Sequence, residues 1–335
     1  MRRFFPSILF GIIIGIFASF IAFHFYFVNV FANKKEISSI SSDVINMLPQ
    51  VSQQQSAFVQ EEKLMPSPLN GLPISQDRAQ LPVIAVVVEN LQPARPQSSL
   101  SKADVIYETL VEGGITRFMA FFQSREADVV GPVRSARTYF AEIVREYDAW
   151  YAHVGGNADA LRFIFQNKLH NLDQFFNPQP YWRDPVRRKK GLEHSMYANT
   201  NDLRAIVTGS FPDTFVSWQF LNSEKEKIQE DVEYDAIEID FSYPAFKVRW
   251  NYDSATDNYT RSLGGFVHKD AQNDEALSAK NIIVQYVKMS LAPRPPRGDE
   301  GALNMQLIGE GDGMLFRNGK SFPLTWRKPE SGKRT

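Results

Sequence analysis

The sequence predicts an α+β protein in which a mixed domain is followed by a smaller, mostly β domain and is preceded by one transmembrane helix. Three observations predict this order. Phe4–Ala32 contains no Lys, Arg, Asp or Glu. Residues 83–208 alternate β-branched runs with apolar residues at helical spacing. From about Tyr234 onward, short apolar strands follow one another, separated by turn residues.

The composition excludes several classes of function. The 335 residues contain 37 Lys and Arg against 38 Asp and Glu, for a net charge of −1. Nucleic-acid-binding domains are strongly basic, so no nucleic acid is expected as a partner. There is no cysteine, which excludes disulfides, thiolate metal sites, cysteine nucleophiles and a lipid-bearing cysteine.

The N-terminal uncharged run predicts a membrane anchor. Ile8–Val28 is long enough to cross a bilayer as a helix, and Arg2 and Arg3 before it favour a cytoplasmic N-terminus. Residues 1–32 are therefore predicted to be a signal-anchor in the cell membrane, a single pass with the folded domains extracytoplasmic. The alternative is a signal peptide cleaved at Val30–Ala32, but the apolar run exceeds the 7–15 residues usual for one.

Three further segments follow the anchor. Residues 33–65 are rich in Ser and Gln and are predicted to be a flexible tether. The first domain is assigned to residues 66–225 and the second to residues 226–335.

The first domain shows strand and helix patterns in turn. Val83–Val88 is typical of a strand buried on both faces. Asp104–Glu112 and Ile115–Phe122 predict a hairpin closed by Gly113-Gly114, and Thr138–Tyr151 predicts an amphipathic helix. The remaining expectations are a strand at 152–154, a helix capped by Asn157 that buries Leu161, Ile164 and Phe165, an ordered loop over 170–198 and a short helix over 202–208.

The second domain is predicted to be β throughout. Its expected strands are 236–241, 246–252, 259–263, 281–288, 304–308, 314–317 and 321–326, the last two joined by an Asn318-Gly319 hairpin turn.

Several blocks of sequence resemble one known family. In the first domain they are Glu89-Asn90, Pro93–Ser98, Ala103–Glu108, Val111–Phe118, Gly131–Arg137, Tyr147–Ala149 and His153–Gly156. In the second domain they are Trp250–Asp253, Tyr259–Arg261, Ala279–Asn281 and Asn318–Lys320. Together they resemble the YerB-like family of bacterial envelope lipoproteins, which has no assigned molecular function. The resemblance implies that the first domain is a layered α/β sandwich.

The chain departs from that family in two ways. It has no lipobox cysteine, so a transmembrane anchor would replace the lipid. The family's second domain continues beyond the strand at Thr325-Trp326 to a final hairpin, so the resemblance predicts a truncated C-terminal domain here.

The predicted hairpin carries the first polar constellation. With a two-residue turn, Glu112 pairs with Ile115 and Glu108 with Met119, which places Glu108, Glu112 and Arg117 on one face. Such a pair of carboxylates could serve as general acid and base. A structural salt-bridge triad explains the same residues and is the favoured interpretation.

The second constellation is the start of the predicted helix at residue 138. Ser135 would cap that helix, and Arg134 and Arg137 beside it would bind a phosphate or carboxylate. The alternative is that these arginines pair with internal carboxylates, namely Glu89, Glu112 or Asp148. Arg95, six residues after the first strand, fits either arrangement.

Two further segments carry polar residues that could bind a ligand. His153 ends a strand before Gly155 and Gly156, where a ligand could approach the backbone; a hydrogen-bonded core histidine is the favoured alternative. Arg183 and His194 lie in an aromatic and basic segment suited to sugar rings and anions, although a solvated basic loop is the explanation for most such charge runs. No metal-ligand spacing is present, and neither a metal nor a cofactor is predicted.

Three functions remain open on the sequence alone. The first is binding of an anionic cell-envelope polymer or a partner protein. The second is a hydrolase or transferase that uses Glu108 or Glu112 with His153, and the third is a purely structural scaffold. The binding hypothesis predicts that one pocket brings together Glu112, Arg117, Arg134, Arg137, His153 and His194.

Overall fold

The computed structural model describes residues 64–212, 215–220, 235–292 and 301–335, all within the compact unit Glu62–Thr335. The predicted anchor and nearly all of the predicted tether lie outside the described residues. Within the described ranges, no helix is both long enough and apolar enough to cross a membrane.

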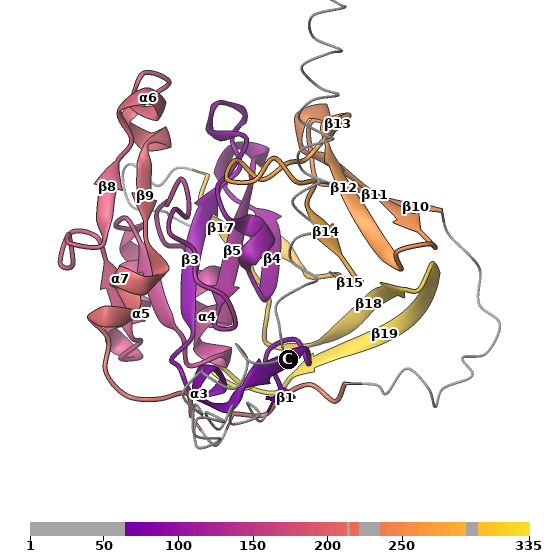
Figure 1. Cartoon of the computed structure of the whole chain (residues 1–335), viewed down its shortest axis with the longest axis horizontal. Coiled ribbons are helices and arrows are strands. Elements are labelled where there is room, and N and C mark those ends of the chain that lie inside the picture. Colours follow the sequence, from indigo (N-terminus) through magenta and orange to yellow (C-terminus); the bar gives the residue numbers. More distant parts are fainter. Residues whose placement is uncertain (1–63, 213–214, 221–234, 293–300) are drawn as a thin grey trace, which may run out of the picture. The chain divides into compact units, whose positions relative to one another are not determined.

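The central sheet of the first domain has five strands in the order β4-β5-β3-β6-β7 (Figure 1). β3, β6 and β7 are parallel, and β5 runs antiparallel to both β3 and β4. All six residues of β3 are buried, as its β-branched run predicts. The strands are β3 (Ile84–Glu89), β4 (Val105–Leu110), β5 (Thr116–Phe122), β6 (Trp150–His153) and β7 (Asn171–Asp173).

Two helices, α4 (Thr138–Glu146) and α5 (Ala158–Gln166), pack with one face of this sheet in a single hydrophobic core. The predicted cap of α5 is confirmed, because the Asn157 side chain accepts a hydrogen bond from Ala160 N at 3.0 Å. The predicted cap of α4 is wrong: Arg137 occupies the N-cap position, without a side-chain hydrogen bond. Of the three residues predicted to be buried on α5, only Ile164 is, because 38% of Leu161 and 84% of Phe165 are exposed.

The β4–β5 hairpin differs from the prediction by one residue in register. Glu108 pairs with Phe118, because the turn is a short 3-10 helix, Glu112–Gly114, instead of two residues. Arg117 lies opposite Thr109, the residue after Glu108. Because successive side chains of a strand point to opposite faces of the sheet, Arg117 and Glu108 lie on opposite faces. The predicted triad on one face is therefore wrong.

Residues 170–198, predicted as a loop, contain regular strands and a short helix, and we call this segment the arm. After β7 come β8 (Tyr181–Arg183), α6 (Pro185–Arg188) and β9 (Met196–Ala198), and β8 pairs with β9 (Figure 1). The arm is built locally: the Asp184 side chain caps α6 by accepting a hydrogen bond from Arg187 N at 2.7 Å. The next helix, α7 (Thr200–Ala205), confirms the short helix predicted there.

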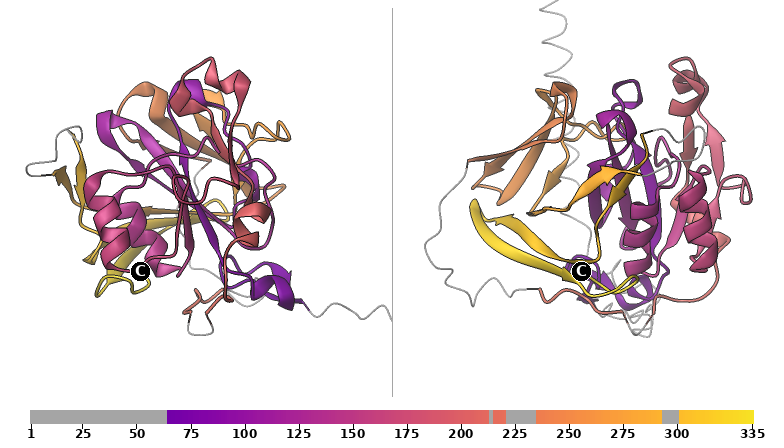
Figure 2. Two further views of the ribbon diagram at one scale, coloured as in Figure 1. Left: turned by 90° about the vertical axis from the view of Figure 1, so that its left-hand side faces the viewer. Right: turned by 180° about the vertical axis from the view of Figure 1, so that it is seen from behind.

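The second domain is built of strands, as predicted. Its Asn318-Gly319 turn joins β18 to β19 in a long hairpin (yellow in Figure 2), and both turn residues have the positive φ that this turn requires. The strands are β10 (Ala236–Asp240), β11 (Lys247–Asp253), β12 (Asn258–Leu263), β13 (Phe266–Val267), β14 (Ser278–Ala279), β15 (Asn281–Gln285), β16 (Met289–Leu291), β17 (Leu303–Met305), β18 (Gly309–Arg317) and β19 (Lys320–Lys328). The unit opens with β1 (Leu64–Pro66), β2 (Pro73–Ser75) and α3 (Gln76–Ala79).

Buried polar groups join the two domains. Arg261 of β12 forms an ion pair with Glu108 of β4 at 2.6 Å and donates a hydrogen bond to His268 Nδ1. Because Arg261 can only donate, the proton of His268 is on Nε2, which donates to Gln97 Oε1 at 2.7 Å. Only 3% of Arg261 and 4% of His268 is exposed.

His268 makes stability depend on pH. Burial, together with the positive charges of Arg261 and Arg95, lowers the pKa of His268 from 6.5 to about 2. The unfolded chain therefore binds a proton below pH 6.5 that the folded chain excludes. We expect this side chain to reduce the free energy of unfolding by about 1.4 kcal/mol per pH unit as pH falls below 6.5.

Chemical denaturation of the full chain between pH 7 and 4.5 checks this prediction. The His268→Gln variant should show a flatter dependence of the unfolding free energy on pH. An equal slope in the two proteins would contradict a neutral, buried His268.

Candidate functional site

The candidate site lies where the carboxyl ends of the parallel strands β3 and β6 meet. The segment 133–136 passes between these two ends: Arg134 N donates to Val87 O, and Val154 N donates to Arg134 O, both at 3.0 Å. Open α/β sheets bind ligands at this edge of the sheet. The backbone therefore places Arg134 at a position suited to a ligand contact.

Glu89, the last residue of β3, is the acidic centre of the site. It is fully buried, and its Oε1 lies 3.3 Å from Arg134 Nε. Its Oε2 forms a hydrogen bond with His194 Nδ1 at 2.8 Å. A buried carboxylate requires such partners, so Arg134 and His194 are held next to the strand end.

Arg117, at the start of β5, is a buried cation without an acidic partner. Only 3% of it is exposed, its Nη1 donates to Ser135 O at 3.2 Å, and its Nε has no hydrogen-bond partner. In the described part of the chain, no carboxylate oxygen lies within 4.0 Å of its guanidinium. Burial, and the charges of Arg137 and Arg134, lower the pKa of Arg117 to about 10, although the charge of Glu112 opposes this shift.

Arg137 is fully engaged inside the domain. Its Nε and Nη2 donate to the two carboxylate oxygens of Glu112 at 2.6 and 2.8 Å. Burial alone would raise the pKa of Glu112, but the hydrogen bonds and charge of Arg137 outweigh burial and lower it. The predicted alternative, pairing with internal carboxylates, is therefore correct for both arginines: Arg137 pairs with Glu112, and Arg134 pairs with Glu89. Arg137 is not available as the main ligand contact, whereas 24% of the Arg134 side chain remains exposed.

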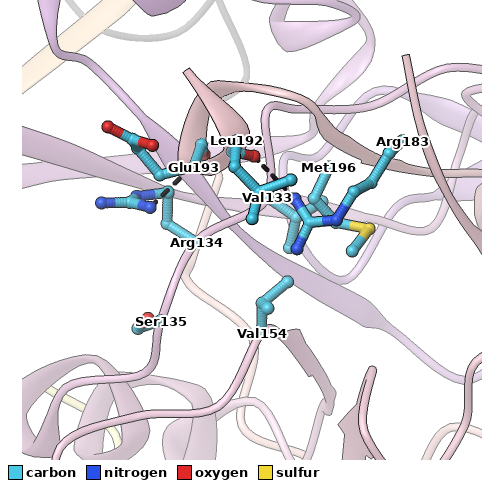
Figure 3. A pocket seen from close by; sticks show the side chains of 8 residues that line it. All are labelled: Val133, Arg134, Ser135, Val154, Arg183, Leu192, Glu193 and Met196. Atoms are coloured by element: carbon cyan, nitrogen blue, oxygen red, sulfur yellow. Dashed lines mark hydrogen bonds between the residues drawn. The ribbon is translucent and has the colours of Figure 1, made fainter. Parts of the chain in front are cut away.

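A cavity of about 210 Å³ opens beside Arg134 (Figure 3). Arg183 of β8 stands on its other side, where its Nη1 donates to Leu192 O at 2.6 Å. Arg134 Nη1 donates to Glu193 O at 3.3 Å, and 24% of the Arg134 side chain stays exposed. The cavity is lined by Val133, Arg134, Ser135, Val154, Arg183, Leu192, Glu193 and Met196.

Positive charge exceeds negative charge around this cavity. Arg134 is paired with Glu89, whereas the buried Arg117 and the exposed Arg183 have no carboxylate partner among the described residues. Glu193, which lines the cavity, has 53% of its side chain exposed to solvent. The arrangement can therefore accept an anionic group, with guanidinium donors on two sides.

His153 does not reach the cavity. It is fully buried, its Nδ1 is 2.8 Å from Gly155 O, and its Nε2 is 2.9 Å from Asn171 Oδ1. Burial lowers the pKa of His153, although the charge of Asp173 opposes this shift. His153 is thus a hydrogen-bonded core histidine, and its bond to Gly155 stabilises the turn before α5.

Glu108 and Arg95 belong to the contact between the two domains. Besides Arg261, Glu108 binds the Thr116 hydroxyl at 2.7 Å. Arg95 donates to Ala245 O at 2.8 Å and lies 5.0 Å from the centre of the Phe246 ring. Of the predicted site residues, the structure therefore gathers Arg134 and His194 around Glu89, with Arg117 opposite it on β5. Arg183 shares the cavity with Arg134, and Arg137 pairs with Glu112.

Sequence reasoning named Glu89 as a possible partner of the arginines but missed its hydrogen bond with His194. An acidic residue directly at the end of a fully buried strand is a signal that could have indicated it. Glu193 and Leu192 were missed because their place at the cavity depends on the fold of the arm. Among the described residues, no group of three or more His, Asp or Glu side chains could hold a metal ion.

The fold and the site define a two-domain α+β protein with a cationic cavity at the edge of its central sheet. Residues 69–212 match the family described as "Protein of unknown function (DUF3048) N-terminal domain", and residues 237–335 match its C-terminal domain. The chain belongs to this YerB-like family, which confirms the resemblance.

Two comparisons agree with this assignment. The chain is 29% identical over 293 residues to "Putative lipoprotein YerB" of Bacillus subtilis (strain 168), covering 82% of each chain. It is also similar to the crystal structure of the YerB protein from Bacillus subtilis, with a TM-score of 0.67 and 28% identity. That match covers 81% of this chain and 89% of the other.

Proposed function

We propose that this protein is a membrane-held extracytoplasmic module that binds an anionic group of a cell-envelope polymer or a partner protein. The cavity between Arg134 and Arg183 is the binding site. The observation that carries the proposal is the buried Arg117 guanidinium, which has no carboxylate oxygen within 4.0 Å among the described residues and donates to the carbonyl oxygen of Ser135. Ser135 lines a cavity that presents two more guanidiniums, those of Arg134 and Arg183.

The energetics of Arg117 support an anionic ligand. A buried charge without a counter-charge is unfavourable, and proteins usually provide an ion partner for it. Arg117 donates to Ser135 O, and Ser135 lines the cavity. A phosphate or carboxylate in the cavity would accept hydrogen bonds from Arg134 or Arg183, and it would add negative charge next to Ser135, the residue to which Arg117 donates.

The extracytoplasmic location rests on the sequence and on the relative. The uncharged run Phe4–Ala32 predicts a signal-anchor, and the relative carries the name of a lipoprotein. Because this chain has no cysteine, the proposed attachment is a single transmembrane helix.

The structure favours binding over the hydrolase or transferase alternative. Glu112 is held by Arg137, Glu108 by Arg261, and His153 by Gly155 and Asn171. A general acid–base pair needs its members in hydrogen-bond reach of one reacting group. These three side chains belong to three separate hydrogen-bonded groups.

Titration of the full chain in detergent with long-chain polyphosphate and with poly-L-glutamate tests the proposal. We expect at least one polymer to bind, and Arg134→Gln to weaken that binding tenfold or more through the loss of a charge-assisted hydrogen bond. Arg125→Gln is the matched control, because Arg125 is an exposed arginine of the first domain that does not line the cavity. Equal affinities of the two variants, or binding of neither polymer, would contradict the proposal.

A further inference from the structure

Four exposed apolar side chains form a strip on α5 and on the segment after β7. Their exposed fractions are high for apolar residues: 38% for Leu161, 84% for Phe165, 68% for Phe175 and 79% for Phe176. Leu161 and Phe165 are four residues apart on α5 and share one face of it. Contiguous exposed apolar surface of this kind marks an interaction site in a soluble domain. We call these four residues the apolar strip.

The apolar strip begins where the cavity ends. A Cβ atom built on Gly155 would lie 3.2 Å from the Phe175 ring, and one built on Gly156 would lie 3.2 Å from Leu161 Cδ2. Val154, the residue before these glycines, lines the cavity. The strip and the cavity are therefore two ends of one surface, connected by Gly155 and Gly156.

The arm contributes several cationic side chains to this surface. Arg183 lines the cavity, and Arg188, Lys189 and Lys190 at the end of α6 are exposed. Over residues 181–195, five cationic residues face only two acidic ones, Asp184 and Glu193. The surface thus combines exposed phenylalanines with an excess of positive charge.

We propose that the ligand of this surface is an anionic lipid bilayer. A lipid phosphate binds between Arg134 and Arg183, while the apolar strip enters the boundary between headgroups and acyl chains. This inference rests on the anion site of the proposed function, and it assigns a lipid phosphate, in place of a polymer or protein group, as the anion bound there. Phenylalanines beside basic residues are the combination that binds anionic membrane surfaces.

The position of the chain on its membrane favours this occupant over a protein. The predicted anchor ends at residue 32, and the 31 residues of 33–63 can span at most roughly 110 Å. Such a tether keeps the folded unit at a high effective concentration near the bilayer that holds the anchor. Modest contacts from the apolar strip are then sufficient for docking.

The absence of native cysteine allows a direct test with the full chain in nanodiscs. A single Phe176→Cys variant is labelled with a polarity-sensitive fluorophore, and Phe266→Cys serves as the matched control. Phe266, in β13 of the second domain, has the same 79% exposure as Phe176. We expect a blue-shifted emission and at least twofold quenching by spin-labelled lipid at position 176 in phosphatidylglycerol discs, and neither effect at position 266. Equal signals at the two positions would overturn the proposal.

Two further measurements separate this proposal from the anion site itself. In phosphatidylcholine discs, and in phosphatidylglycerol discs after Arg183→Gln, the label at position 176 should lose its blue shift. Docking that persists unchanged in both cases overturns the role of the lipid phosphate. Polyphosphate binding by Arg134, without any docking at position 176, overturns the membrane proposal and leaves the anion site intact.

Discussion

Replacing Lys328 with methionine is expected to lower the free energy of unfolding by about 3–5 kcal/mol, the usual effect of breaking a buried ion pair. Lys328 of β19 is fully buried, and its Nζ lies 2.9 Å from Glu142 Oε1 and 2.5 Å from Glu146 Oε1. Both glutamates belong to α4 and are themselves buried. The variant would leave two carboxylates close together without a cation.

Lys333→Met is the matched control for this prediction. Lys333 lies five residues further along, has 63% of its side chain exposed and pairs with Glu330 at 3.7 Å. Exposed pairs contribute little, so chemical denaturation of the full chain should show no resolved change for this variant. If both lysine variants shifted the unfolding midpoint equally, the buried lysine would not hold the second domain to α4.

The second large effect is expected at Arg261. Its guanidinium joins β12 to Glu108 of β4 at 2.6 Å, and it lies 5.4 and 5.7 Å from the ring centres of Phe118 and Trp250. Arg261→Met would leave Glu108, with only 13% of its side chain exposed, without its counter-charge. We expect this to cost about 3 kcal/mol. Amide hydrogen exchange should show that β4 and β12 lose protection together, because both contribute to the contact between the domains.

Arg249→Met provides the comparison within the same sheet. Arg249 of β11 is exposed and pairs with the exposed Glu238, so its removal should leave the exchange pattern unchanged. The account of the domain contact fails if Arg261→Met leaves β4 as protected as Arg249→Met does.

The elements that the sequence predicted well are those with a strong local signal. The unbroken run of β3 is buried on both faces, and Asn157 caps α5 as its residue type predicts. The Asn318-Gly319 turn also fits its residue types, because both residues adopt positive φ readily. These features depend on neighbouring residues alone, so a pattern in the sequence was sufficient.

The features that the sequence could not determine depend on long-range contacts. A turn longer by one residue shifted the β4–β5 register and moved Arg117 away from Glu108. Phe165 has the spacing of a core residue but lies 84% exposed at the end of α5. The sequence could not show that Arg134 pairs with Glu89 and Arg137 with Glu112, because each pair joins residues from separate elements of the fold.

The affinity of the full chain for long-chain polyphosphate, compared between the natural protein and Arg117→Met, tests the central claim most directly. Arg117 has no acidic partner among the described residues and 3% exposure, so its removal should cost little stability in the absence of ligand. We predict that Arg117→Met unfolds at the same denaturant concentration as the natural protein or a higher one, and binds polyphosphate at least tenfold more weakly. A destabilised variant that binds polyphosphate as tightly as the natural protein would contradict the account, because Arg117 would then serve the fold and not an anion site.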